Sequence, residues 1–151
     1  MKKVLECISH SPEETESFAH KIARKIQSHI AIGLVGEIGS GKTHFVKGIA
    51  AGIGLDRALI TSPTFTIVNS FLGKFDLYHL DIYRLSSYNE LEYIGFNDLI
   101  YPTSVIIIEW YDRMEKDIGV DLKIEFTYID ANIRKLLLFV NPTSEHTKLW
   151  I

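Results

Sequence analysis

The sequence has little of several features that define large classes of protein. It contains one cysteine among 151 residues, so Cys7 can form neither a disulfide within the chain nor a cysteine-rich metal site. Its longest apolar runs, such as Val105–Ile108, are far shorter than the roughly 20 residues that span a bilayer. The N-terminal residues also lack the apolar segment of a signal peptide. These absences predict a cytoplasmic protein that has no membrane partner.

Positive charge is not in excess. The 16 Lys and Arg residues are outnumbered by 19 Asp and Glu residues, which gives a formal net charge of −3. A chain of this charge has no general attraction to nucleic acid, so any contact with RNA must be local or made through a partner. The 6 histidines show neither H-x-x-x-H nor HExxH spacing, so the sequence offers no zinc motif.

Apolar residues, by contrast, are plentiful. Hydrophobic residues make up 46% of the chain and charged residues 23%, with no low-complexity tract, which is typical of a folded globular protein. The length is close to that of one ordinary domain and too short for two independent cores. We therefore predict a single domain over residues 1–151.

The first third of the chain predicts a helix, a strand and a second helix. Ser11 followed by Pro12 and two acids has the pattern of a helix start, and the apolar spacing extends that helix to about Ser28. The run Ile30–Val35 is typical of a strand buried on both faces in a parallel sheet. After a glycine-rich turn, Lys42 to about Ile53 predicts another helix.

The rest of the chain predicts two hairpins and one further buried strand. Alternating residues over Thr66–Leu80 and again over Val120–Val140, each interrupted by turn residues, favour antiparallel hairpins. Short helical turns are expected within residues 89–100. Val105–Trp110 reads as a buried strand whose apolar run ends in a carboxylate, and a polar tail is expected from Asn141.

One motif points to a chemistry. It matches G-x-x-x-x-G-K-[ST] at every specified position, with the residues Gly36, Glu37, Ile38, Gly39, Ser40, Gly41, Lys42 and Thr43. The glycines allow backbone N–H groups to converge on phosphate oxygens at a helix N-terminus. Lys42 would reach the β- and γ-phosphates and Thr43 would hold Mg²⁺. The competing interpretation is a glycine turn that binds nothing.

This motif and its neighbours define a fold class. A strand, a phosphate loop and a helix in direct succession are typical of the P-loop NTPase fold. The two hairpins cannot belong to a βαβ unit, so the sheet must also contain antiparallel strands. We therefore predict an α/β three-layer sandwich around a mixed parallel and antiparallel central sheet.

Hydrolysis also needs groups that act on the metal and on water. Glu109 ends a buried strand, where it can face Thr43 and either ligate Mg²⁺ through water or polarise the attacking water. The alternative is that Glu109 only caps the following helix. Asp81 follows another strand and can supply a second oxygen to Mg²⁺, or it can be a solvated turn residue. Trp110 is equally compatible with a core aromatic residue and a functional contact.

A proline-containing segment, Ser62–Thr66, lies between the phosphate-loop helix and the next strand. P-loop proteins often carry at this place a switch that becomes ordered on the γ-phosphate. The same residues are equally compatible with a strand that begins at a proline.

Four strings occur in a characteristic order: GEIGSGKTHF, SPTFTIVN, YHLDIYRL and IIIEW. Together they closely resemble the TsaE (YjeE) family of small bacterial P-loop ATPases, and the resemblance covers nearly the whole chain. This family usually has Asp, Leu and Ala at the positions of Glu37, Ile38 and Ser40, and often Thr at the position of His44. None of these differences affects a specified position of the phosphate loop.

The resemblance implies roles for particular residues. Lys42 and Thr43 are then expected to serve phosphate and Mg²⁺, and Asp81 and Glu109 to act on the metal and the hydrolytic water. Thr64 is expected in a switch-like loop, and Trp110 in a functional contact. The resemblance further implies a nucleotide site that includes His44 and holds the base between the start of the first helix and the last hairpin, near Ser11, Thr15 and Arg134.

The resemblance also implies a pathway and partners. Members of the family are required for threonylcarbamoyladenosine modification of tRNA at the adenosine next to the anticodon. They act with the proteins TsaB and TsaD, so tRNA would be met indirectly, through the complex. The scattered arginines provide no complete arginine finger, so we expect low ATPase activity from the isolated chain and activation by partners.

Other functions can be built on a phosphate loop. A small-molecule kinase needs an arginine-bearing lid, and the sequence shows no such cluster. A GTPase needs an [NT]-K-x-D motif at a strand end, whereas the nearest string, Gly73–Asp76, lies in a predicted hairpin turn. A nucleotide switch that does not hydrolyse is compatible with the same residues. Single-turnover hydrolysis, measured with and without partners, would separate these functions.

Overall fold

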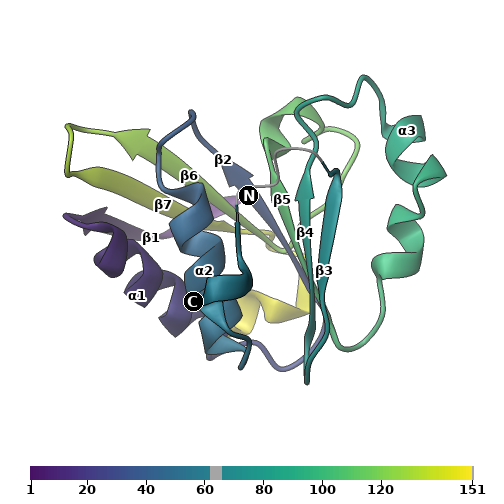
Figure 1. Cartoon of the computed structure of the whole chain (residues 1–151), viewed down its shortest axis with the longest axis horizontal. Coiled ribbons are helices and arrows are strands. Elements are labelled where there is room, and N and C mark those ends of the chain that lie inside the picture. The colour runs from purple at the N-terminus through teal and green to yellow at the C-terminus, as the bar shows by residue number, and fades with distance from the viewer. Residues whose placement is uncertain (62–65, 151) are drawn as a thin grey trace.

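A computed structural model describes residues 1–61 and 66–150 (Figure 1). The strands are β1 Lys2–Ser9, β2 Ile30–Val35, β3 Val68–Phe71, β4 Asp76–Asp81, β5 Ser104–Glu109, β6 Leu122–Tyr128 and β7 Arg134–Val140. The α-helices are α1 Pro12–Ala23, α2 Lys42–Gly52 and α3 Tyr88–Tyr93, and shorter 3₁₀ helices cover Arg57–Leu59, Phe96–Leu99, Tyr111–Arg113 and Glu145–Leu149. Over these described ranges, no helix is both long enough and apolar enough to cross a membrane.

The strands form one seven-stranded sheet in the order β1-β7-β6-β2-β5-β4-β3. At its centre, β2 is parallel to both β5 and β6, and β4 is parallel to β5. The outer pairs, β3 with β4, β6 with β7, and β7 with β1, are antiparallel. The predicted mixed sheet and both predicted hairpins are confirmed.

Apolar side chains from the two faces of the sheet enter two separate cores. One core joins α1 and α2 to alternate residues of the central strands, including Ile32, Ile107 and Leu122. The other joins the opposite face to Leu91 of α3, to Tyr111 and to the segment that follows it. The sheet therefore lies between two layers, as the predicted three-layer sandwich requires, and Figure 1 shows α1 and α2 together on one side.

Glycines of α2 allow α1 and α2 to pack closely. A Cβ added to Gly48 would lie 2.3 Å from the carbonyl oxygen of Glu16 and 2.6 Å from the Cβ of Ala19. A Cβ on Gly52 would lie 2.3 Å from that of Ala23. The backbone of the phosphate-loop helix is thus held directly against α1, and both helices contribute to one cavity.

Three local predictions were incomplete or wrong. The first helix ends at Ala23 and not near Ser28, because the amides of Lys25 and Ile26 bond three residues back and tighten the chain into a turn before β2. Strand β1 was not predicted. The expected polar tail instead forms a 3₁₀ helix that buries His146 and Trp150 against the body of the protein.

Candidate functional site

The phosphate loop joins the end of β2 to the start of α2. Gly39 has a φ of 77° and Gly41 a φ of 103°, conformations that residues with a Cβ rarely adopt. Gly41 is the N-cap residue of α2, and no side chain caps its first amides. Backbone N–H groups at this helix start are therefore available to an anion, as the motif predicts.

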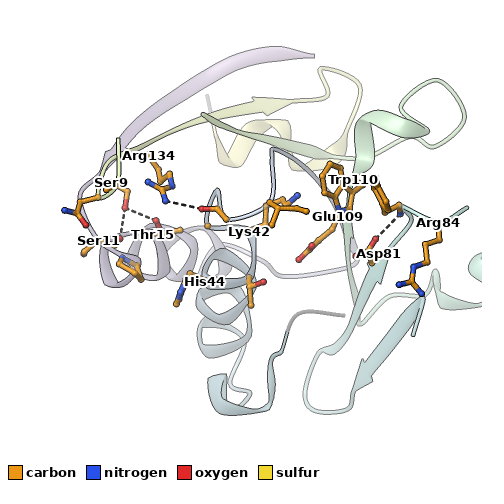
Figure 2. A pocket seen from close by; sticks show the side chains of 18 of the residues that line it. Ser9, Ser11, Thr15, Lys42, His44, Asp81, Arg84, Glu109, Trp110 and Arg134 are labelled. Atoms are coloured by element: carbon orange, nitrogen blue, oxygen red, sulfur yellow. Dashed lines mark hydrogen bonds between the residues drawn. The ribbon is translucent and has the colours of Figure 1, made fainter. Parts of the chain in front are cut away.

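A cavity of about 910 Å³ opens over this loop. Its walls come from α1, the phosphate loop, the ends of β4 and β5, and the turn between β6 and β7. Figure 2 shows Arg134 and Thr15 on one side of Lys42, and Glu109, Trp110 and Asp81 on the other. The predicted site residues that line the cavity are Ser11, Thr15, Ile38, Gly39, Gly41, Lys42, Thr43, His44, Asp81, Glu109, Trp110 and Arg134.

Lys42 is buried and held by two contacts. Its ammonium donates a hydrogen bond to the carbonyl oxygen of Gly36 and lies 3.8 Å from the centre of the Trp110 ring. Burial lowers the pKa of Lys42, and the nearby carboxylates of Glu109 and Asp81 oppose that shift. The ammonium therefore sits at the base of the loop, between a backbone oxygen and an aromatic face.

Asp81 and Glu109 end neighbouring parallel strands in the same register. They are directly paired across β4 and β5, so their side chains lie on the same face of the sheet. Burial raises the pKa of Asp81; the amide of Tyr83 donates to its Oδ1 at 2.9 Å and opposes this, and the charge of Glu109 raises the pKa further. Two like charges placed opposite each other are unfavourable unless a cation lies close to both.

The side chain of Glu109 contacts a buried histidine. Nε2 of His79 lies 2.9 Å from Oε1 of Glu109, with His79 fully buried and the Glu109 side chain 5% exposed. The N-cap residue of the 3₁₀ helix that follows is Trp110 and not Glu109, whose carboxylate contacts His79 and lines the cavity. The capping interpretation of Glu109 was therefore wrong. Asp81 forms a turn bond to Tyr83 and also lines the cavity, so it fits both interpretations.

Trp110 follows Glu109 in an unusual backbone conformation. Its φ of 63° is the only positive φ outside glycine in the described part of the chain. The ring covers Lys42 and lies 4.8 Å from the centre of the Tyr83 ring. Sustained strain of this kind is common at functional sites. Trp110 is thus both packed against aromatic and apolar groups and part of the cavity wall.

The other end of the cavity is polar. Arg134 donates to the carbonyl oxygen of Gly39 at 3.1 Å and stacks on Tyr128. On α1, the hydroxyl of Thr15 is 2.7 Å from that of Ser9, which also donates to the carbonyl oxygen of Ser11. Sequence reasoning missed Ser9, because it belongs to a strand that was not predicted.

Not every predicted residue lines the cavity. Gly36, Glu37 and Ser40 do not, although Gly36 receives the bond from Lys42. Thr64 lies outside the described residues. Arg84, one of the scattered arginines, also lines the cavity. The string Gly73–Asp76 forms a hairpin turn closed by a bond from the Gly73 amide to Asp76, as expected.

The fold and the loop define the class of protein: a P-loop NTPase-type protein, with a phosphate loop between β2 and α2 of a three-layer α/β fold. Comparison with known proteins gives the family. Residues 9–136 match the family described as "Threonylcarbamoyl adenosine biosynthesis protein TsaE", and the chain belongs to this family.

Similar proteins have the same description. A TsaE protein of Treponema pallidum is 37% identical over 114 residues, which cover 76% of this chain and 84% of the relative. One of Aquifex aeolicus is 33% identical over 141 residues, covering 92% of this chain and 98% of the relative. Both are named tRNA threonylcarbamoyladenosine biosynthesis proteins. The crystal structure of Bacillus subtilis YdiB is similar at 26% identity with a TM-score of 0.72, and the match covers 97% of this chain and 90% of YdiB.

Proposed function

We propose that this chain binds and hydrolyses ATP with Mg²⁺, in the cytoplasm and as a single P-loop domain. We further propose that the hydrolysis serves threonylcarbamoyladenosine modification of tRNA, together with TsaB and TsaD. Family membership supports the pathway. The proposed partners follow from the family resemblance, and tRNA would be reached through the complex.

One observation carries the hydrolytic part of the proposal. The phosphate loop and the paired carboxylates of Asp81 and Glu109 line the same cavity, although they lie far apart in the sequence. A protein that only binds nucleotide needs the loop, whereas hydrolysis also needs groups at the edge of the loop that act on the metal and on water, here the buried Glu109 and the half-buried Asp81. Their presence favours hydrolysis over a switch that does not hydrolyse.

The residues present fit a triphosphate with a hard divalent cation. The uncapped start of α2 and the two left-handed glycines leave backbone amides for phosphate oxygens. Thr43, Asp81 and Glu109 offer only oxygen ligands, which Mg²⁺ prefers. Within the described ranges, no group of three or more His, Cys, Asp and Glu side chains could hold a metal ion by itself. Mg²⁺ is usually bound by one or two carboxylates together with substrate phosphates, so this arrangement suits it.

In the proposed mechanism each residue has one task. Lys42 would leave Trp110 and Gly36 to contact the β- and γ-phosphates, and Thr43 and Asp81 would hold the cation. Bound Mg²⁺ would neutralise charge on the phosphates. Glu109 would align the attacking water with the γ-phosphorus and accept its proton as the water oxygen bonds to that phosphorus, while the bond from the phosphorus to the leaving ADP oxygen breaks. Arg134, Ser11 and Thr15 hold the nucleoside end.

The decisive experiment separates binding from turnover. We expect Glu109→Ala to leave binding of a fluorescent ATP analogue measurable while single-turnover hydrolysis is lost. Glu92→Ala is the matched control, because Glu92 is exposed on α3 and does not line the cavity. Equal hydrolysis rates for the wild type and Glu109→Ala would refute the role of Glu109 and favour a nucleotide switch.

A second experiment tests the partners. Hydrolysis by the purified chain should be slow and should rise when TsaB and TsaD are added, because a site without a complete arginine finger leaves charge on the transferred group uncompensated. Formation of threonylcarbamoyladenosine on tRNA should then depend on an intact Lys42. High turnover of the chain alone, unchanged by the partners, would contradict this part of the proposal.

A further inference from the structure

His79 has a position in the fold that packing alone does not explain. It is fully buried on β4, between Leu77, which belongs to the apolar core under α1 and α2, and Asp81 at the cavity. Alternate residues of a strand share a face, so Leu77, His79 and Asp81 point to the same side of the sheet. An apolar residue at this position would simply extend the core by one layer.

Only one of the two ring nitrogens of His79 has a hydrogen-bond partner among the described residues. Nε2 contacts Oε1 of Glu109 at 2.9 Å, whereas Nδ1 is buried and has no hydrogen-bond partner among the described residues. A buried polar atom without a partner is unfavourable, because it has lost its hydrogen bonds to water. A bare ring nitrogen is an acceptor, so this arrangement fits the neutral tautomer that carries its proton on Nε2. That tautomer donates to Glu109.

The contact with His79 engages one of the two carboxylate oxygens of Glu109. The register pairs His79 with Ile107 and Asp81 with Glu109. His79 is therefore a diagonal neighbour of Glu109 and lies two residues before the end of β4. With Oε1 bonded to the histidine, Oε2 is the oxygen left for the cavity, which Glu109 lines. Figure 2 shows the Glu109 side chain directed into the space beside Lys42 and Trp110.

We propose that His79 is a positioning residue for the hydrolytic step: by donating from Nε2 to Oε1, it fixes the rotamer of Glu109 so that the second carboxylate oxygen is aimed at the attacking water. The inference rests on the proposed ATPase function. His79 does not line the cavity, so it would act only through Glu109. Outer partners of this kind typically change activity by about 10- to 100-fold when removed.

The first test uses kinetics of the full-length chain. His79→Leu should lower kcat by roughly 10- to 100-fold while affinity for the ATP analogue changes little, because the phosphate loop is untouched. His79→Gln should restore much of kcat, since its side-chain amide can donate from nearly the same place. In a Glu109→Ala background, His79→Leu should have no further effect on hydrolysis.

A control and a spectroscopic readout separate positioning from stability. His29→Leu removes another histidine bond, to Ser104 at the opposite end of the sheet, and should lower Tm without lowering kcat. Independently of activity, ¹⁵N NMR of the histidine rings should show His79 protonated at Nε2. A ring protonated only at Nδ1 would overturn the inference, as would a kcat for His79→Leu equal to that of the wild type.

The outcomes distinguish this inference from the function on which it rests. Hydrolysis that survives Glu109→Ala would refute the catalytic role of Glu109, and the role of His79 with it. Hydrolysis that is lost in Glu109→Ala but kept in His79→Leu would refute the role of His79 alone. A kcat that falls equally in His79→Leu and His79→Gln would also refute it, because a restored donor would then have no effect.

Discussion

Replacing Gly48 by alanine tests how tightly the phosphate-loop helix is fixed. Alanine inside a helix is ordinarily better than glycine by about 1 kcal/mol. Here the new Cβ would lie 2.3 Å from a backbone oxygen of α1, which cannot rotate away as a flexible side chain can. Forcing extra volume between packed elements costs typically about 1–3 kcal/mol. The steric cost therefore exceeds the gain in helix propensity, and we expect a net loss of roughly 1–2 kcal/mol.

Thermal unfolding measures this loss. For a chain of this length, 1 kcal/mol corresponds to about 2–4 °C, so Tm of Gly48→Ala should fall by about 2–8 °C. Gly119→Ala is the matched control: a Cβ there meets nothing within 4 Å, and Tm should stay the same or rise slightly. Affinity for nucleotide should also weaken in Gly48→Ala, because α1 and α2 both line the cavity. An unchanged or raised Tm would refute the close packing of the two helices.

Other predictions follow from single contacts. Lys42→Ala should abolish binding of a fluorescent ATP analogue, whereas Lys47→Ala, outside the cavity, should not; retained binding in the first would contradict the phosphate-loop assignment. Arg134→Ala removes the cation bonded to Gly39 and should weaken nucleotide affinity about tenfold by isothermal titration, with little change in Tm. Burial raises the pKa of Asp81 in the folded chain, so the ionised side chain destabilises the fold increasingly as pH rises through that pKa. Asp81→Asn should therefore raise Tm at pH 7, and the gain should vanish below about pH 3.9, the ordinary pKa of aspartate; a gain independent of pH would refute this reasoning.

The central elements could be predicted because their signals are local. Strand β2 has the predicted bounds, and the bounds of α2 and β5 agree with the prediction within about one residue. A run of buried aliphatic residues predicts a strand from its own residues, and a glycine-rich turn predicts the helix that follows it. Strand β1 could not be predicted in the same way. It pairs at the edge of the sheet with β7, some 130 residues away, and its alternation is broken by a register shift between Lys3 and Leu5.

The same distinction holds for the site. The phosphate loop is contiguous, so its spacing alone reveals it. Glu109 was predicted at the end of a buried strand and Asp81 just after another strand, but their pairing depends on the register of β4 against β5, which no local pattern encodes. The bond between His79 and Glu109 depends on that register too and on the rotamers of two buried side chains. Position in three dimensions, and not residue type, made His79 a candidate.

The covering of Lys42 by Trp110 has a consequence for selectivity among anions. A ligand that reaches the ammonium must replace both an aromatic contact, worth about 0.5–2 kcal/mol, and a carbonyl hydrogen bond. Sulfate or orthophosphate is too small to contact Lys42 and all of the phosphate-loop amides at the same time. We therefore expect the chain to bind small inorganic anions weakly and to bind polyphosphates more tightly.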